Sequence, residues 1–165
     1  LSGIENDRIK NYEQAMELAC EGRRTMAVVI QEMIDADVAG VCLSFAPNSQ
    51  EPDGSLVVEA VFGLGETLVG GQVEPDSWMI DRKSRTVSKY RAGRQTFKLS
   101  AGGRQLVSSH LQSARKLNDE QIEAVVSLLF NVEEKLNMPA ADIEFCFSGN
   151  QIYCLQARPL VVVDG

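Results

Sequence analysis

The stretch DIEFCFSGNQIYCLQARP, residues 142–159, decides the fold. Apolar and polar residues alternate on both sides of a polar segment that contains Gly149, and this pattern predicts two antiparallel strands joined by a tight turn. The side chains of a strand point alternately to its two faces. The first strand is therefore predicted to have an apolar face, with Ile143, Phe145 and Phe147, and a second face with Asp142, Glu144 and Cys146.

The return strand divides in the same way. Its apolar face is predicted to hold Tyr153, Leu155 and Ala157, and its polar face Ile152, Cys154, Gln156 and Arg158. If the turn is centred on Gly149, Asp142 lies opposite Gln156 and Glu144 opposite Cys154. Two carboxylates, an amide and a guanidinium then converge on one face of the hairpin.

This converging face suits a metal and a phosphate. Mg²⁺ prefers one or two carboxylates together with phosphate oxygens of a substrate. An arginine beside the metal can hold a phosphate through two parallel hydrogen bonds. The alternative is an amphipathic hairpin whose polar face only contacts water, and the residues alone leave that alternative open.

The rest of the chain predicts helices and strands in an α+β arrangement. Apolar residues at helical spacing predict a first helix over residues 9–19, and residues 26–34, 38–45, 55–62 and 78–82 are predicted strands. The clearest helix is predicted to begin at Asn118, which can form a capping box with Gln121, and Pro139 limits its continuation. Its buried stripe is predicted to comprise Ile122, Val125, Val126, Leu129, Val132 and Leu136.

Composition narrows the class of protein. A chain of 165 residues with 44% hydrophobic and 24% charged residues is expected to form a single globular domain, residues 1–165. The net charge of −7 argues against a nucleic-acid partner. We expect no membrane partner and a cytoplasmic location, because the chain has neither a long apolar run nor a signal peptide. The four cysteines lack the spacing of a zinc site.

Basic residues are concentrated between positions 82 and 104. Polar residues and glycines among them predict exposed strands and loops. A solvated hairpin face explains such a run most simply, and a contact with another domain is the alternative. The residues are Arg82, Lys83, Arg85, Lys89, Arg91, Arg94, Lys98 and Arg104.

The spacing Asp-x-Glu followed by Gln-x-Arg-Pro resembles the nucleotide-binding domain of phosphoenolpyruvate synthase and pyruvate phosphate dikinase. Other blocks agree with that family in the same order, and the resemblance covers roughly residues 25–160. They are TMAVVIQEMI at 25–34, DVAGV at 37–41, GLGE at 63–66 and VEPD at 73–76. Rifampin phosphotransferases carry a similar domain.

The resemblance implies the second subdomain of an ATP-grasp fold, so the chain is expected to be a fragment of a larger enzyme. An upstream ATP-grasp subdomain and a phosphohistidine domain are the implied partners, and ATP and Mg²⁺ the implied cofactors. The enzyme would phosphorylate a histidine on a separate swivelling domain, whereas the fragment alone is expected to be inactive. A rifampin phosphotransferase-like enzyme and a non-catalytic nucleotide-binding module are the alternatives.

The resemblance also implies functional roles for the residues of this sequence that match the family's motifs. Glu144 and Gln156 are the implied metal ligands, and Arg158 is the implied catalytic residue that stabilises the transferring phosphates. Asp142 is a weaker candidate that would support the metal or the start of the strand. Residues implied to border the adenine, the ribose or the phosphates are Gln31, Glu32, Met33, Ser44 and Glu66.

Some of these positions have competing interpretations. Without the resemblance, Met33 is typical of a core residue, and GLGE is typical of a plain turn. Residues 44–50, SFAPNSQ, depart from the family's loop, because Ser44 keeps a hydroxyl where the family has Thr but the family's Thr-Gly pair is missing. His110 is the only histidine, and its spacing from Gly102-Gly103 excludes it as a phosphohistidine, so we interpret it as a surface residue.

Overall fold

The computed structural model describes residues 28–45 and 54–160. Its internal contacts divide the chain into residues 1–32 and 33–165, and the fold described below is that of the second unit. The helix predicted over residues 9–19 lies outside the described residues. Among the described residues, no helix is long and apolar enough to cross a membrane.

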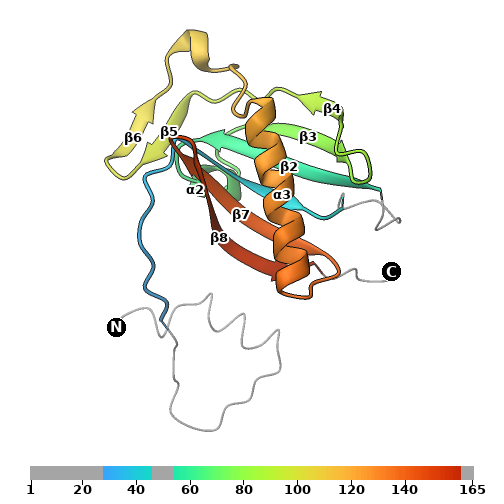
Figure 1. Cartoon of the computed structure of the whole chain (residues 1–165). Helices are drawn as coiled ribbons and strands as arrows, with labels where there is room; N and C mark the ends of the chain where they lie inside the picture. The colour runs from blue at the N-terminus through green and yellow to red at the C-terminus, as the bar shows by residue number, and fades with distance from the viewer. Residues whose placement is uncertain (1–27, 46–53, 161–165) are drawn as a thin grey trace, which may run out of the picture. The chain divides into compact units, whose positions relative to one another are not determined.

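A six-stranded antiparallel sheet forms the body of this unit (Figure 1). Its strands run in the order β4-β3-β2-β1-β7-β8, and a separate hairpin is made by β5 (Phe97–Ser100) and β6 (Gly103–Leu106). The fold class is α+β and mainly antiparallel, as predicted. The strands of the sheet are β1 (Val38–Leu43), β2 (Ser55–Phe62), β3 (Asp76–Asp81), β4 (Val87–Arg91), β7 (Ala141–Ser148) and β8 (Gln151–Pro159).

Three of the predicted strands are confirmed with small shifts of their ends, and the all-exposed β4 agrees with the exposed strands predicted for the basic segment. The strand predicted over residues 26–34 is wrong for its described part, because residues 28–34 have no regular secondary structure. A strand is stable only when a neighbour satisfies its backbone. Both sides of β1, the next strand along the chain, are already paired with β2 and β7.

Helix α3 (Asp119–Lys135) crosses one face of the sheet (Figure 1). Two short helical turns, α2 (Glu66–Val69) and η2 (Ser109–Leu111), complete the described elements. Burial of the apolar stripe of α3 against the sheet forms the main core. Leu136 is an exception to the predicted stripe, because it caps the helix and is 54% exposed. The core includes Trp78, Ile80, Leu117, Ile122, Val125, Val126, Leu129, Ile143, Phe145 and Phe147.

The predicted capping box of α3 is present. The Asn118 side chain accepts a hydrogen bond from the Gln121 amide at 2.8 Å, and the Gln121 side chain accepts one from the Asn118 amide at 3.0 Å. We expect Asn118→Ala to lower the free energy of unfolding by about 1 kcal/mol. Urea unfolding measures this change. Asn131→Ala, at an exposed position within the same helix, is the control and should be neutral or slightly stabilising, because alanine favours a helix interior. Equal losses in both variants would contradict the role of the cap.

The register of the β7–β8 hairpin differs from the prediction. Ser148 pairs with Gln151, so the turn has two central residues, and Gly149 adopts a φ of +57° there. A β-bulge between Glu144 and Phe145 then shifts the register by one further residue. Glu144 consequently lies opposite Gln156, and Asp142 opposite Arg158. The predicted pairs Glu144–Cys154 and Asp142–Gln156 are wrong.

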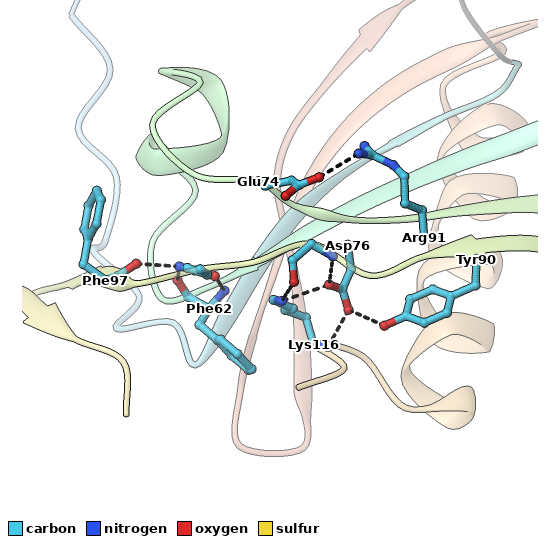
Figure 2. Close-up of polar contacts among 9 residues, drawn as sticks. Phe62, Glu74, Asp76, Tyr90, Arg91, Phe97 and Lys116 are labelled. Atoms are coloured by element: carbon cyan, nitrogen blue, oxygen red, sulfur yellow. Dashed lines mark hydrogen bonds and ion pairs between the residues drawn. The ribbon is translucent and has the colours of Figure 1, made fainter. Parts of the chain in front are cut away.

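A buried ion pair links Lys116, in the segment between β4 and α3, to Asp76 on β3 (Figure 2). The Lys116 ammonium lies 2.9 Å from the Asp76 carboxylate, and both side chains are fully buried. Asp76 also accepts hydrogen bonds from the Tyr90 hydroxyl and from the Gly93 and Lys116 amides, at 2.8–3.0 Å. Burial, together with the hydrogen bond to Asp76, raises the pKa of Tyr90, so its hydroxyl stays protonated as the donor.

Gln95 makes a second link between this segment and the sheet. Its fully buried side chain accepts from the Phe62 amide at 2.8 Å and donates to the Phe62 and Phe97 carbonyls at 2.9 and 3.0 Å (Figure 2). The Leu64 amide donates to the Leu99 carbonyl at 2.8 Å. The β5–β6 hairpin and the turn after β2 are thereby held together at one end of the sheet.

Candidate functional site

The face of the sheet opposite α3, here called the open face, carries the candidate site. Cross-strand pairing arranges its side chains in rows that run from β8 to β4. One row consists of the cross-strand partners Gln156, Glu144, Val41, Glu59, Ser77 and Arg91. The adjacent row contains Arg158, Asp142, Leu43, Val57, Met79 and Lys89.

Glu144 and Gln156 are directly opposite each other on β7 and β8. Glu144 is half-buried and Gln156 is exposed. Within the described residues, neither side chain has a hydrogen-bond or ion-pair partner. A carboxylate and an amide oxygen are thus presented side by side with their bonding capacity unused, as a ligand or hydrated cation would require.

Arg158 is held next to them by Asp142. The Arg158 Nε donates to Asp142 Oδ2 at 2.8 Å, and its Nη2 lies 2.7 Å from the same oxygen. The Asp142 side chain is only 10% exposed, whereas that of Arg158 is 62% exposed. The buried carboxylate therefore orients the guanidinium, whose remaining donors stay accessible. The predicted convergence of Asp142, Glu144, Gln156 and Arg158 is present despite the register error.

Ser44 lies on the opposite face of the sheet from Glu144. It follows β1 on the α3 side of the sheet and is 1% exposed. Its hydroxyl contacts the Glu133 carboxylate at 2.5 Å, the Ala141 carbonyl at 2.9 Å and the Ala141 amide at 2.6 Å. The hydroxyl is therefore buried and fully used on the face away from Glu144. Its contact with phosphate stays a prediction. In this structure, Ser44 joins the end of β1 to α3 and β7.

The segment predicted to border the adenine is exposed. Gln31 and Glu32 belong to the first unit of the chain and have no regular secondary structure. Met33 is 68% exposed, so it is not a core residue and its thioether is available to a ligand. The roles of these residues stay predictions.

The GLGE turn lies against the open face at the end nearest β5. A Cβ added to Gly65 would lie 3.6 Å from the Ala39 Cβ, which places this glycine beside the start of β1. Gly63 has a φ of +78°, and a Cβ there would lie 2.1 Å from the Leu99 carbonyl oxygen, so the turn requires glycine. Glu66 begins α2 and is exposed.

Leu64 and its neighbours form an apolar cluster at this end of the open face. The cluster comprises Ile34, Ala36, Ala39, Leu64, Cys146, Tyr153 and Leu155. Burial raises the pKa of the Cys146 thiol, and it is the main cause of a raised pKa at the exposed Cys154. Neither thiol is therefore poised as a thiolate. An apolar patch beside a few convergent polar groups is typical of a small-molecule site.

Glu59 was absent from the predicted site residues. It is half-buried on β2, on the other side of Val41 from Glu144. Alternation along the predicted strand 55–62 sets it on the face opposite Val58 and Ala60, so the pattern contained this signal. What the pattern lacked was the strand order that brings β2 and β7 to either side of β1.

Comparison with known proteins identifies the family. Residues 2–164 match the family described as pyruvate phosphate dikinase, AMP/ATP-binding domain, and the chain belongs to that family. It is 34% identical over 143 residues to a probable phosphoenolpyruvate synthase of Archaeoglobus fulgidus, covering 84% of this chain and 19% of that protein.

Two further relatives carry other names. The chain is 31% identical to the uncharacterized phosphotransferase YvkC of Bacillus subtilis, over 95% of this chain and 19% of that protein. It is 32% identical to a rifampicin phosphotransferase of Streptomyces sviceus, over 84% of this chain and 16% of that protein. The predicted resemblance is confirmed, and the relatives are of the kinase and transferase class. The chain spans about one fifth of the length of these curated relatives.

Proposed function

We propose that this chain is the second ATP-grasp subdomain of a phosphoenolpyruvate synthase-like phosphotransferase, and that its open face binds the phosphates of Mg²⁺-ATP. One observation carries the proposal. Glu144 and Gln156 are paired across β7 and β8 with unused oxygen ligands, beside an arginine that Asp142 orients, in a chain of the AMP/ATP-binding family.

The residues present fit a magnesium ion. Among the described residues, no three His, Cys, Asp or Glu side chains cluster as a metal site. Mg²⁺ does not require such a cluster, because it is usually bound through one or two carboxylates, substrate phosphates and water. Glu144 and the Gln156 amide oxygen would hold it, and the bound ion would neutralise charge on the phosphates.

Arg158 would supply the second positive charge. Phosphoryl transfer depends mainly on positioning and on neutralisation of charge that spreads over the phosphate oxygens. An exposed guanidinium fixed from behind by Asp142 meets both needs, because it need not be ordered when the nucleotide arrives. The apolar cluster around Leu64 and Ala39 offers an adjacent surface for the base.

The proposal extends to the whole enzyme. The complementary ATP-grasp subdomain and a swivelling domain with the accepting histidine would be its partners, in the cytoplasm. Exposed Met33 and Glu66 would face the nucleotide from the borders of the open face.

Calorimetric titration of the chain with ATP, with and without Mg²⁺, tests this function. We expect saturable binding that is at least about tenfold tighter with Mg²⁺, because the ion joins Glu144 to the phosphates. Undetectable binding, or an affinity for ATP that does not depend on Mg²⁺, would overturn the proposal.

Asp142→Asn tests the positioning of Arg158. We expect the affinity for Mg²⁺-ATP to fall about threefold to tenfold, because the amide holds the guanidinium more weakly. Thermal stability should change little, since Arg158 is mostly exposed and can turn to water. The same titration measures the affinity. A parallel Asp119→Asn variant, which weakens the exposed pair between Arg115 and the first residue of α3, should bind like the wild type.

A further inference from the structure

A small hollow lies on the open face at the β4 edge of the sheet. It has a volume of about 110 Å³ and is lined by Ser77, Met79, Lys89 and Arg91, and it is called here the edge pocket. Ser77 pairs with Arg91 and Met79 with Lys89, so all four side chains come from adjacent positions on β3 and β4. None of these residues belongs to the site proposed above.

The edge pocket combines two cationic side chains with a hydroxyl. Within the described residues, the Lys89 ammonium and the Ser77 hydroxyl have no hydrogen-bond or ion-pair partner. Arg91 Nη1 donates to Glu74 Oε1 at 3.0 Å (Figure 2). That pair is exposed, 56% for Arg91 and 54% for Glu74, so it contributes little and leaves further guanidinium donors accessible.

Four other basic residues of segment 82–104 contact side chains outside the edge pocket. Arg82 binds Glu133 on α3 at 2.5 Å, and Arg85 binds Glu123 at 3.2 Å, both with their guanidinium groups over the Phe130 ring. Arg94 donates to Gln112, and Arg104 lies over the Phe97 ring. The basic run is therefore not one solvated face, and Lys89 and Arg91 are the part of it that lines a hollow.

We propose that the edge pocket binds a phosphate-type oxyanion. A tetrahedral oxyanion accepts hydrogen bonds from several directions, which suits a guanidinium, an ammonium and a hydroxyl that converge on one hollow. The pocket lies on the same face as Glu144, three strands away, or about 14 Å at normal strand spacing. Free phosphate and the phosphates of a second nucleotide share this chemistry.

An edge strand offers a different explanation for Lys89. Lysines on edge strands prevent a second chain from pairing with the exposed backbone. That role requires positive charge but no anion, and it predicts that phosphate has no specific effect. It also gives Glu74 no influence on phosphate, whereas the proposal makes Glu74 a competitor for Arg91.

Titration of the chain with inorganic phosphate, followed by amide NMR shifts at constant ionic strength, tests the proposal. Saturable shifts are expected at β3 and β4 without any nucleotide. Lys89→Met and Arg91→Met should each weaken binding about fivefold or more, because each removes a charge-assisted hydrogen bond. Glu74→Gln should strengthen it, since the guanidinium is released. Lys83→Met, on the exposed β3–β4 turn, is the matched control and should leave binding unchanged.

Repeating the titration with Mg²⁺-ATP present separates the two sources. Displacement of phosphate by the nucleotide would assign the pocket to the phosphates of a second nucleotide, and unchanged phosphate affinity would assign it to free phosphate; both support the pocket. Shifts no larger than those with chloride, or equal affinity in Lys89→Met and Lys83→Met, would overturn it. Because the first titration uses no ATP, its outcome is separate from that of the proposed function.

Discussion

Glu144→Ala is expected to remove the Mg²⁺-dependent part of ATP binding, with an affinity loss of about 10-fold to 100-fold. Glu144 presents the unpaired carboxylate of the β7–β8 pair, and Gln156 alone offers a neutral amide oxygen. A hard dication bound through phosphates and water needs at least one protein carboxylate nearby. Titration with ATP at several Mg²⁺ concentrations measures the loss.

The folded state should survive this substitution. The Glu144 side chain has no hydrogen-bond or ion-pair partner among the described residues, so its removal breaks no such contact there. The melting temperature should therefore stay close to that of the wild type. Glu134→Ala, which removes the same charge from an exposed position of α3, is the control for the change in net charge. Wild-type Mg²⁺ dependence in Glu144→Ala would place the metal elsewhere.

The convergence of the site was predictable because two errors in the predicted register cancelled. Together they shift the pairing by two residues, and a shift of two leaves each side chain on the same face of the strand. The turn shifts the pairing by one residue and the bulge by another, so the residues after the bulge return to their predicted face. Gln156 and Arg158 thus face the same way as Glu144. Before the bulge the shift is one residue, so Tyr153 and Ile152 occupy faces opposite to those predicted, and the first packs with Ala39 and the second with the main core.

Strict alternation predicts which side chains share a strand face, but a bulge inserts a residue without any change in that pattern. Ser44 shows the complementary case. Its hydroxyl matched a family position by type, whereas its place two residues after Cys42 puts it on the α3 side. Chemical similarity at a position predicts a contact only when the face is also correct.

Lys116→Met is expected to lower the free energy of unfolding by about 3–5 kcal/mol, because it leaves the Asp76 carboxylate buried without a countercharge. Such a loss is comparable to the whole stability of many small domains. The 40-residue separation between the two partners explains why the sequence did not reveal the pair. Urea unfolding measures the loss, with Lys83→Met as the exposed control.

The double variant Asp76→Asn, Lys116→Met distinguishes loss of charge balance from loss of packing. It removes both charges, so it should be more stable than Lys116→Met alone even though it carries one more substitution. A buried ammonium that also donates to the Gly93 carbonyl at 3.0 Å orders the segment that leads to β5 (Figure 2). Amides of Gly93 and Gln95 should therefore exchange faster in Lys116→Met, ahead of those in α3. A loss below about 1 kcal/mol, or a double variant less stable than the single one, would contradict a structural role for this ion pair.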